Sequence, residues 1–328
     1  MSYKPSSLSS IISGINTEIF LPHIQRSFVW DQEQMHRLFD SLMRNFPIQT
    51  FLFWHTKEEI KARRFMDALE WDIDLHKLYD ISKSQAGVEK KFVLDGQQRL
   101  QTLFCLFNGG IMGEGSRLLE AYVDLTSGDV EDENGLSYRL EFLKAPRSLP
   151  WYRLRDLLGR DNQKNAEDIA DRINSELDGI LNGEVEISRK EREKLVRRNI
   201  SQLVSLVREE RHFWIQTLDG LNNDFPYQKI LDIFVRVNSG GTKLDAADLL
   251  FAAMKEAWTS FEENLEEIIE QLNTSGLSFD KSFALNCLLV VNNKGAELTT
   301  LKFHGKEEDE VIKTLEYNWE RAEQTFWN

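Results

Sequence analysis

The chain has 328 residues, of which 41% are hydrophobic and 29% charged, a composition typical of a globular protein with one large domain or two smaller ones. Its formal net charge of −14 excludes a surface that is basic throughout, so nucleic acid would have to contact local basic patches. Two cysteines are too few for a disulfide framework, and no Cys/His cluster has zinc-site spacing. The sequence shows neither a secretory leader nor an apolar run long enough for a membrane span, which predicts a cytoplasmic protein without a membrane partner.

The first 150 residues mix helix and strand signals. Apolar residues at helical spacing predict a helix over residues 31–45, with Asp31 as its N-cap and Pro47 after its end. Short apolar runs predict strands over residues 18–21, 49–54, 91–94, 121–125 and 138–142, the last two as a hairpin.

After Pro150 the pattern changes to charged, helix-compatible segments. We expect helices over residues 165–181, 188–207, 227–237 and 244–258, and a strand over residues 212–216. The last segment, residues 308–327, has helical spacing without a C-cap, and its apolar side chains need a partner. The sequence therefore predicts an α+β fold with a large helical portion, and a chain that is a piece of a longer protein.

The sharpest motif spans residues 92–104, where an apolar strand leads through Asp95 and Gly96 into an amphipathic helix. Backbone N–H groups and the helix dipole favour an anion at such a helix start, and Gly96 allows a ligand to approach the backbone. The guanidinium of Arg99 is placed to meet a phosphate. A structural alternative is a capping box between Asp95 and Gln98. Asp95 would also repel a phosphate unless magnesium lay between them.

A second motif, residues 21–30, places Gln25 and Arg26 between apolar side chains just before the first predicted helix. These two residues can offer directed hydrogen bonds to a ligand. The alternative is a surface cation–π pair between Arg26 and Trp30.

The third motif, residues 233–245, ends a predicted helix in Asn-Ser-Gly-Gly. Gly240 and Gly241 allow a tight backbone concavity that can hold an anion, with charge from Arg236 and a directed amide from Asn238. The alternative is an ordinary corner between two helices.

In this order, LPHIQRSFVW, VLDGQQRLQTL and FVRVNSGGTKLDAADL resemble the N-terminal domain family of GmrSD-type restriction endonucleases over about residues 6–260. The DGQQR sequence is that family's most specific mark and is matched without change. The resemblance implies a ParB/sulfiredoxin-like nucleotide-binding domain over residues 1–258, with a helical insertion at about 151–211. Residues 259–328 would begin a helical connector to a further domain.

The resemblance further implies an NTP-binding and NTP-hydrolysing module of a modification-dependent DNA restriction or phage-defence system. The catalytic residues would be Asp95, Gln97, Gln98 and Arg99, with Asp95 also holding Mg²⁺ for the NTP. The binding residues would be Gly96, Gln25, Arg26, Arg236, Asn238, Gly240 and Gly241. The alternative is a non-catalytic module that senses a nucleotide or modified DNA and regulates a separate nuclease domain.

The expected partners are DNA, modified or unmodified, and a nuclease domain or subunit of the HNH type, with oligomerisation left open. His304 lacks the partner residues of an HNH site, so cleavage would belong to that other domain or subunit. The densest basic stretch, residues 188–198, places Lys190, Lys194, Arg197 and Arg198 along one side of a predicted helix. That side can follow a phosphate backbone, or it can be a solvated face with internal ion pairs.

Overall fold

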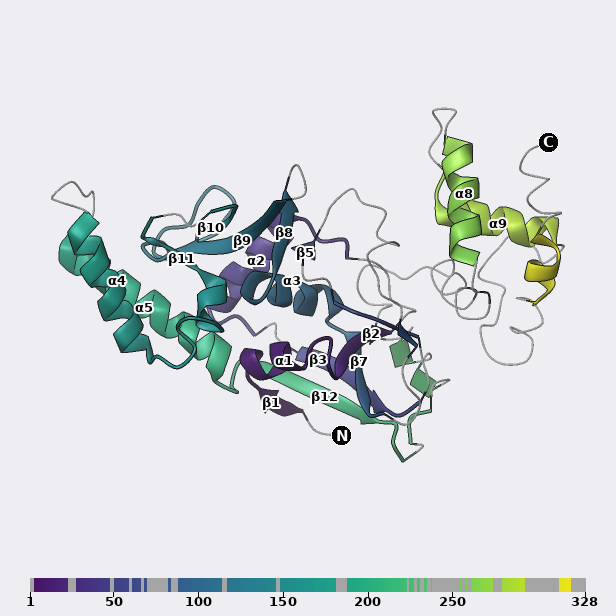
Figure 1. Cartoon of the computed structure of the whole chain (residues 1–328), viewed down its shortest axis with the longest axis horizontal. Coiled ribbons are helices and arrows are strands. Elements are labelled where there is room, and N and C mark those ends of the chain that lie inside the picture. The colour runs from purple at the N-terminus through teal and green to yellow at the C-terminus, as the bar shows by residue number, and fades with distance from the viewer. Residues whose placement is uncertain are drawn as a thin grey trace. The chain divides into compact units, whose positions relative to one another are not determined.

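The computed structural model divides into two compact units, one of Met1–Leu21 and Ser27–Asp224, the other of Pro22–Arg26 and Phe225–Asn328 (Figure 1). The structure describes residues 3–22, 28–47, 50–58, 61–65, 68–69, 82–83, 88–113, 117–145, 148–180, 188–222, 224–226, 229–230, 233–234, 237, 254, 258, 261–273, 279–292 and 313–319. The content of helix and strand in both the first 150 residues and the remainder confirms the predicted α+β class.

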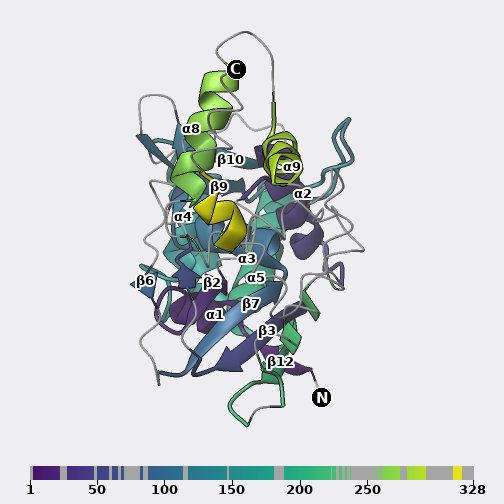
Figure 2. The same cartoon turned by 90° about the vertical axis from the view of Figure 1, so that its right-hand side faces the viewer.

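A mixed sheet is the frame of the first unit, in the order β1-β12-β3-β7-β2-β4-β6. The strands are β1 (Lys4–Ser6), β2 (Ile19–Pro22), β3 (Thr50–Thr56), β4 (Lys61–Arg63), β6 (Ser82–Lys83), β7 (Lys90–Asp95) and β12 (Phe213–Asp219). Strands β3, β7 and β12 lie side by side in Figure 2, with β3 parallel to β12 and antiparallel to β7. The end of β7 therefore lies at the same end of the sheet as the starts of β3 and β12.

Helices α1 (Leu8–Gly14), α2 (Gln32–Met43) and α3 (Gln97–Phe107) belong to the same unit. The predicted cap of α2 is confirmed as a full capping box, because Gln34 N donates to Asp31 Oδ1 at 2.8 Å and Asp31 N donates to Gln34 Oε1 at 3.1 Å. The apolar stripes of α2 and α3 join one continuous core with the side chains of Phe51, Val93 and Phe213 from the sheet.

A second sheet lies on the other side of α2 and α3 in Figure 1. It has the order β10-β9-β8-β5, and β11 also pairs with β9. The strands are β5 (Ala68–Leu69), β8 (Gly110–Gly113), β9 (Arg117–Asp124), β10 (Leu140–Leu143) and β11 (Trp151–Arg153). The antiparallel pairing of β9 with β10 confirms the predicted hairpin.

The charged segments after Pro150 form the 3₁₀ helix η1 (Leu154–Leu157) and an antiparallel pair of long helices, α4 (Ala166–Ile180) and α5 (Arg189–Arg208). A buried carboxylate ties this part together. Asp161 accepts hydrogen bonds from Tyr152 Oη at 2.9 Å, Lys164 Nζ at 2.9 Å and Arg172 Nη2 at 2.7 Å. Burial alone would raise the pKa of Asp161, but these hydrogen bonds and the nearby arginine charges hold it below its usual value.

The described part of the second unit contains α8 (Phe261–Asn273) and α9 (Lys281–Val291). Its core is separate from that of the first unit and includes Trp258, Phe261 and Trp319, whose rings pack edge to face or tilted. Three predicted helices, over residues 227–237, 244–258 and 308–327, lie mostly outside the described residues. None of the helices in the described part of the chain combines the length and apolar composition that a membrane span requires.

Candidate functional site

The DGQQR turn, residues 95–99, joins the last residue of β7 to the first turn of α3. Asp95 still pairs with Leu52 of β3, and Gly96 then takes the left-handed conformation, with φ of 89°, as the N-cap of α3. No side chain among the described residues caps this helix start, and its first turn carries no acidic side chain. A helix that begins in this way presents backbone dipoles that favour an anion.

Gly96 is required both by its conformation and by the space around it. A Cβ atom there would lie 2.5 Å from Cδ1 of Phe51, a buried ring of the adjacent strand β3. Gly135 also has a positive φ, of 76°, but a Cβ at that position would meet no atom within 4 Å. A side chain at Gly135 would meet only the cost of the left-handed backbone, whereas one at Gly96 would also clash with Phe51.

We expect Gly96→Ala to lower the free energy of unfolding by about 2–5 kcal/mol, the sum of a left-handed backbone penalty and an overpacking penalty. Gly135→Ala should lower it by about 1–2 kcal/mol, because only the backbone penalty applies. Urea unfolding of both variants measures the difference. Equal losses would show that the contact with Phe51 does not constrain the turn.

Arg99 lies at the edge of the turn, with its side chain 23% exposed. Its guanidinium carbon lies 5.7 Å from the ring centroid of Phe51, and its Nη2 lies 3.4 Å from Oδ2 of Asp95. The side chain of Asp95 is 41% exposed. The turn thus brings a held cation and an accessible carboxylate to an uncapped helix start.

Gln98 has a different position from the one that a capping box requires. Its side chain is buried, and its Oε1 accepts a hydrogen bond at 2.9 Å from the backbone N–H of Val29. The capping-box alternative for Asp95 and Gln98 is therefore wrong, because Gly96 is the N-cap and no side chain caps it. Gln98, in the first turn of α3, instead bonds to the backbone of Val29, near the end of the second motif. Gln97, the first residue of α3, is half-buried.

The other predicted binding residues, Gln25, Arg26, Arg236, Asn238, Gly240 and Gly241, lie outside the described residues. Sequence reasoning did not identify Phe51 as part of the site. Its only sequence signal was its place in a predicted strand, since its contact with Gly96 depends on the pairing of β3 with β7.

The basic side of α5 is partly ion-paired. Arg197 forms an ion pair with Asp171 of α4, and Arg198 forms one with Asp129. Lys190 and Lys194 are exposed. For the two arginines the structure favours the solvated, ion-paired face over the phosphate-tracking face.

The turn carries one accessible carboxylate, that of Asp95, beside the guanidinium of Arg99. Within the described residues, no three His, Cys, Asp or Glu side chains gather as a metal-binding cluster. Mg²⁺ at nucleotide sites is commonly held by one or two carboxylates together with the phosphates, a pattern that the single accessible carboxylate of Asp95 fits.

The family profile described as "GmrSD restriction endonuclease, N-terminal domain" matches residues 8–255. The chain belongs to this family. The match thus covers the DGQQR turn and, apart from β1, both sheets of the first unit. The description of the family names the domain as part of a restriction endonuclease.

A relative of the chain is the uncharacterized protein MJ0686 of Methanocaldococcus jannaschii, which is 26% identical over 266 residues. The alignment covers 76% of this chain and 42% of the relative. The chain therefore spans less than half the length of the curated relative that it matches.

Proposed function

We propose that the DGQQR turn binds a nucleoside triphosphate with Mg²⁺ and hydrolyses it, as the nucleotide-dependent step of a modification-dependent DNA restriction system in the cytoplasm. The observation that carries this proposal is the helix start itself. A left-handed glycine opens α3 without a side-chain cap, and the guanidinium of Arg99 is held beside it by Asp95 and Phe51. Strand-to-helix turns of this kind are a recurrent setting for phosphate groups.

Each residue of the turn has a distinct proposed role. Gly96 and the first turn of α3 would face the phosphates, and Arg99 would neutralise the charge that develops on them. Asp95 would hold Mg²⁺, which supplies further charge neutralisation to the phosphates when bound. Gln97 would orient the attacking water. Gln98 would position the turn through the backbone of Val29 rather than contact the water.

DNA, modified or unmodified, would be the signal to which hydrolysis responds. Cleavage of that DNA would come from a nuclease domain or subunit of the HNH type, which fits a relative more than twice as long as the region matched here. Gln25, Arg26, Arg236, Asn238, Gly240 and Gly241 are proposed to bind nucleotide or DNA.

A panel of nucleoside triphosphates tests this function directly. Wild-type protein with magnesium should release phosphate from at least one of them, and unmodified or modified DNA should change the rate. Samples without magnesium serve as the control and should show no release. If no triphosphate is turned over under any condition, the enzyme assignment fails.

One observation favours a second candidate, a sensor without turnover. The carboxylate of Asp95 is shared with Arg99, and Oε1 of Gln98 is engaged by the backbone, which leaves few groups to activate a water. In that case the same turn would bind the triphosphate saturably in calorimetry while no phosphate is released. Binding without release would select this candidate.

A further inference from the structure

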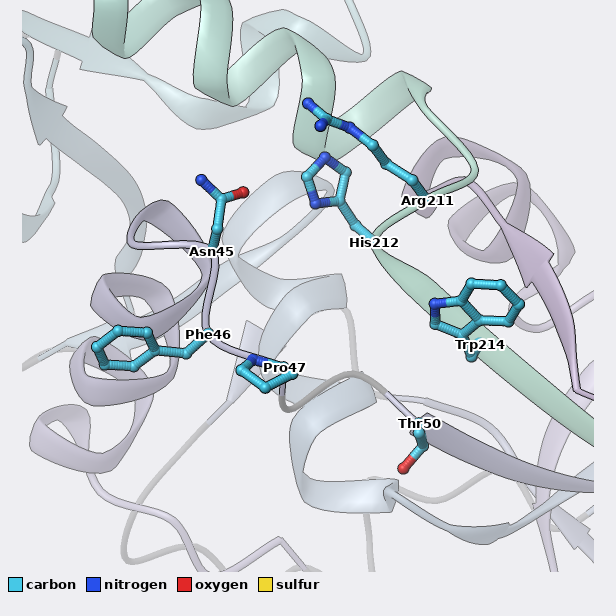
Figure 3. Close-up of a pocket in the computed structure, with 7 residues that line it drawn as sticks. All are labelled: Asn45, Phe46, Pro47, Thr50, Arg211, His212 and Trp214. Carbon is cyan, nitrogen blue, oxygen red and sulfur yellow. The ribbon is translucent and has the colours of Figure 1, made fainter.

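A second feature of the first unit lies outside the DGQQR turn. A cavity of about 340 Å³ opens where the starts of β3 and β12 meet (Figure 3). It lies between residues 45–47 and 50 on one side and residues 211, 212 and 214 on the other. Thr50 and Trp214 are direct neighbours in the parallel pairing of these strands. The volume falls within the range of small-molecule sites, about 300–1,000 Å³.

Trp214 gives this cavity an accessible aromatic wall. The indole is 42% exposed, although the preceding residue, Phe213, is buried and stacks on Phe51 with a centroid separation of 6.1 Å. Phe46 has the guanidinium of Arg44 over its ring, 4.8 Å from the centroid, and Figure 3 shows that ring directed away from the other lining residues. The indole is therefore the aromatic surface on which a planar ligand can stack.

Arg211 and His212 give the cavity a hydrogen-bonding end, with Arg211 also ion-paired to Glu209. Arg211 Nε lies 2.5 Å from Glu209 Oε2, and Arg211 Nη2 donates to Ser205 Oγ at 2.8 Å, so the guanidinium is held in place. His212 Nε2 lies 2.8 Å from the same Ser205 Oγ. Among the described residues, Arg211 Nη1 and His212 Nδ1 have no hydrogen-bond partner. Burial and the charge of Arg211 lower the pKa of His212, while Glu209 opposes them, so the imidazole is neutral near pH 7.

These groups match one kind of ligand. We propose that the cavity binds a planar ring that carries an anionic group, the chemistry of a nucleotide, with the ring on Trp214 and the anion at Arg211. The hydroxyl of Thr50 and Nδ1 of His212 are placed to meet polar atoms of the ligand. Stacking on an exposed aromatic side chain beside an arginine is how proteins hold unpaired bases. The ligand can be a free nucleotide or an unpaired unit of a DNA strand, and the site is additional to the proposed triphosphate site.

Calorimetric titration without magnesium tests this site. The probes are the four common nucleoside monophosphates, the matching nucleosides and a short single-stranded DNA. Trp214→Ala should weaken binding of monophosphate or strand roughly 5- to 150-fold, the range found for loss of one stacked base. Arg211→Gln should remove the preference for a monophosphate over its nucleoside. Tyr317→Ala removes an aromatic side chain that is 89% exposed elsewhere and should change nothing.

The result also identifies the source of the ligand. Binding of the DNA strand but of no monophosphate would show that the cavity binds DNA. Competition between the strand and a monophosphate would show that the cavity accepts both ligands. Equal affinity of Trp214→Ala and wild type, or no binding of any probe, would overturn the site. Phosphate release by wild type is measured separately. Loss of nucleotide binding in Trp214→Ala with no triphosphate turnover in wild type would therefore reject the proposed hydrolysis and retain this site.

Discussion

Arg99→Ala is expected to reduce magnesium-dependent phosphate release by at least about 100-fold, the loss typical of removing one charge-stabilising group from a reacting site. The guanidinium is held between the Phe51 ring and Asp95, at the edge of an uncapped helix start. Its removal would leave the charge that develops on the phosphates without the guanidinium of this turn. Arg99→Lys keeps the charge but loses the two-point geometry, so its rate should lie between those of wild type and the alanine variant.

A matched arginine controls for general effects of the substitution. Arg37 of α2 also pairs with a carboxylate four residues before it, Glu33, at 2.7 Å, but lies on an exposed face. Arg37→Ala should leave phosphate release unchanged. Thermal melting of all variants checks folding, since a loss of release is informative only in a folded protein. An Arg99→Ala protein that is folded and fully active would exclude the DGQQR turn as the reacting site.

The second large effect concerns stability. Asp161→Ala should lower the free energy of unfolding by about 3–5 kcal/mol, because it removes the buried acceptor of Tyr152, Lys164 and Arg172 and leaves their donors unpaired. Asp168, at the exposed start of α4, is the matched control. Asp168→Asn should change the value by about 0.5 kcal/mol or less. Urea unfolding at pH 7 measures both, and a loss at Asp161 no larger than that at Asp168 would contradict the role given to the cluster.

The pH dependence of stability follows from the same carboxylate. The pKa of Asp161 is lower in the folded chain than in the unfolded chain, where it is about 3.9. Its contribution is therefore fully present above about pH 4 and is lost as the pH falls through the folded pKa. Unfolding measured from pH 6 downward should show this acid loss in wild type. Asp161→Asn should show a smaller acid loss, and an unchanged acid dependence would contradict the assignment.

Two segments with the same spacing show what the sequence alone could and could not predict. Asp31 and Gln34 have the capping-box pattern and form it. Asp95 and Gln98 have the same pattern, but Asp95 remains paired with β3 as the last residue of β7, and the N-cap lies one residue later, at Gly96. Gln98 then bonds to Val29, a residue far away in sequence. Local propensity predicted both helices. The N-cap of α3 could not be predicted in this way, because it depends on the pairing of Asp95 with β3.

The elements that sequence patterns predicted best were those with a clear period. The strands at β3, β7 and β12 and the helices α2, α4 and α5 all occur close to their predicted bounds. The short strands β1, β8 and β11 were not predicted, because three or four residues are too few to show a period and they form only through pairing with longer strands. The position of Phe51 beneath Gly96 and Arg99 likewise depends on strand pairing and was outside the reach of sequence patterns.

Hydrogen exchange with a non-hydrolysable nucleoside triphosphate is the most direct test of the central claim, because it locates the nucleotide whether or not turnover occurs. The backbone amides of residues 95–99 should exchange more slowly when wild-type protein is saturated with the analogue and magnesium. Arg99→Ala should show little of this protection at the same concentration. Protection elsewhere in the chain, with residues 95–99 unchanged in wild type, would show that the DGQQR turn is not the nucleotide site.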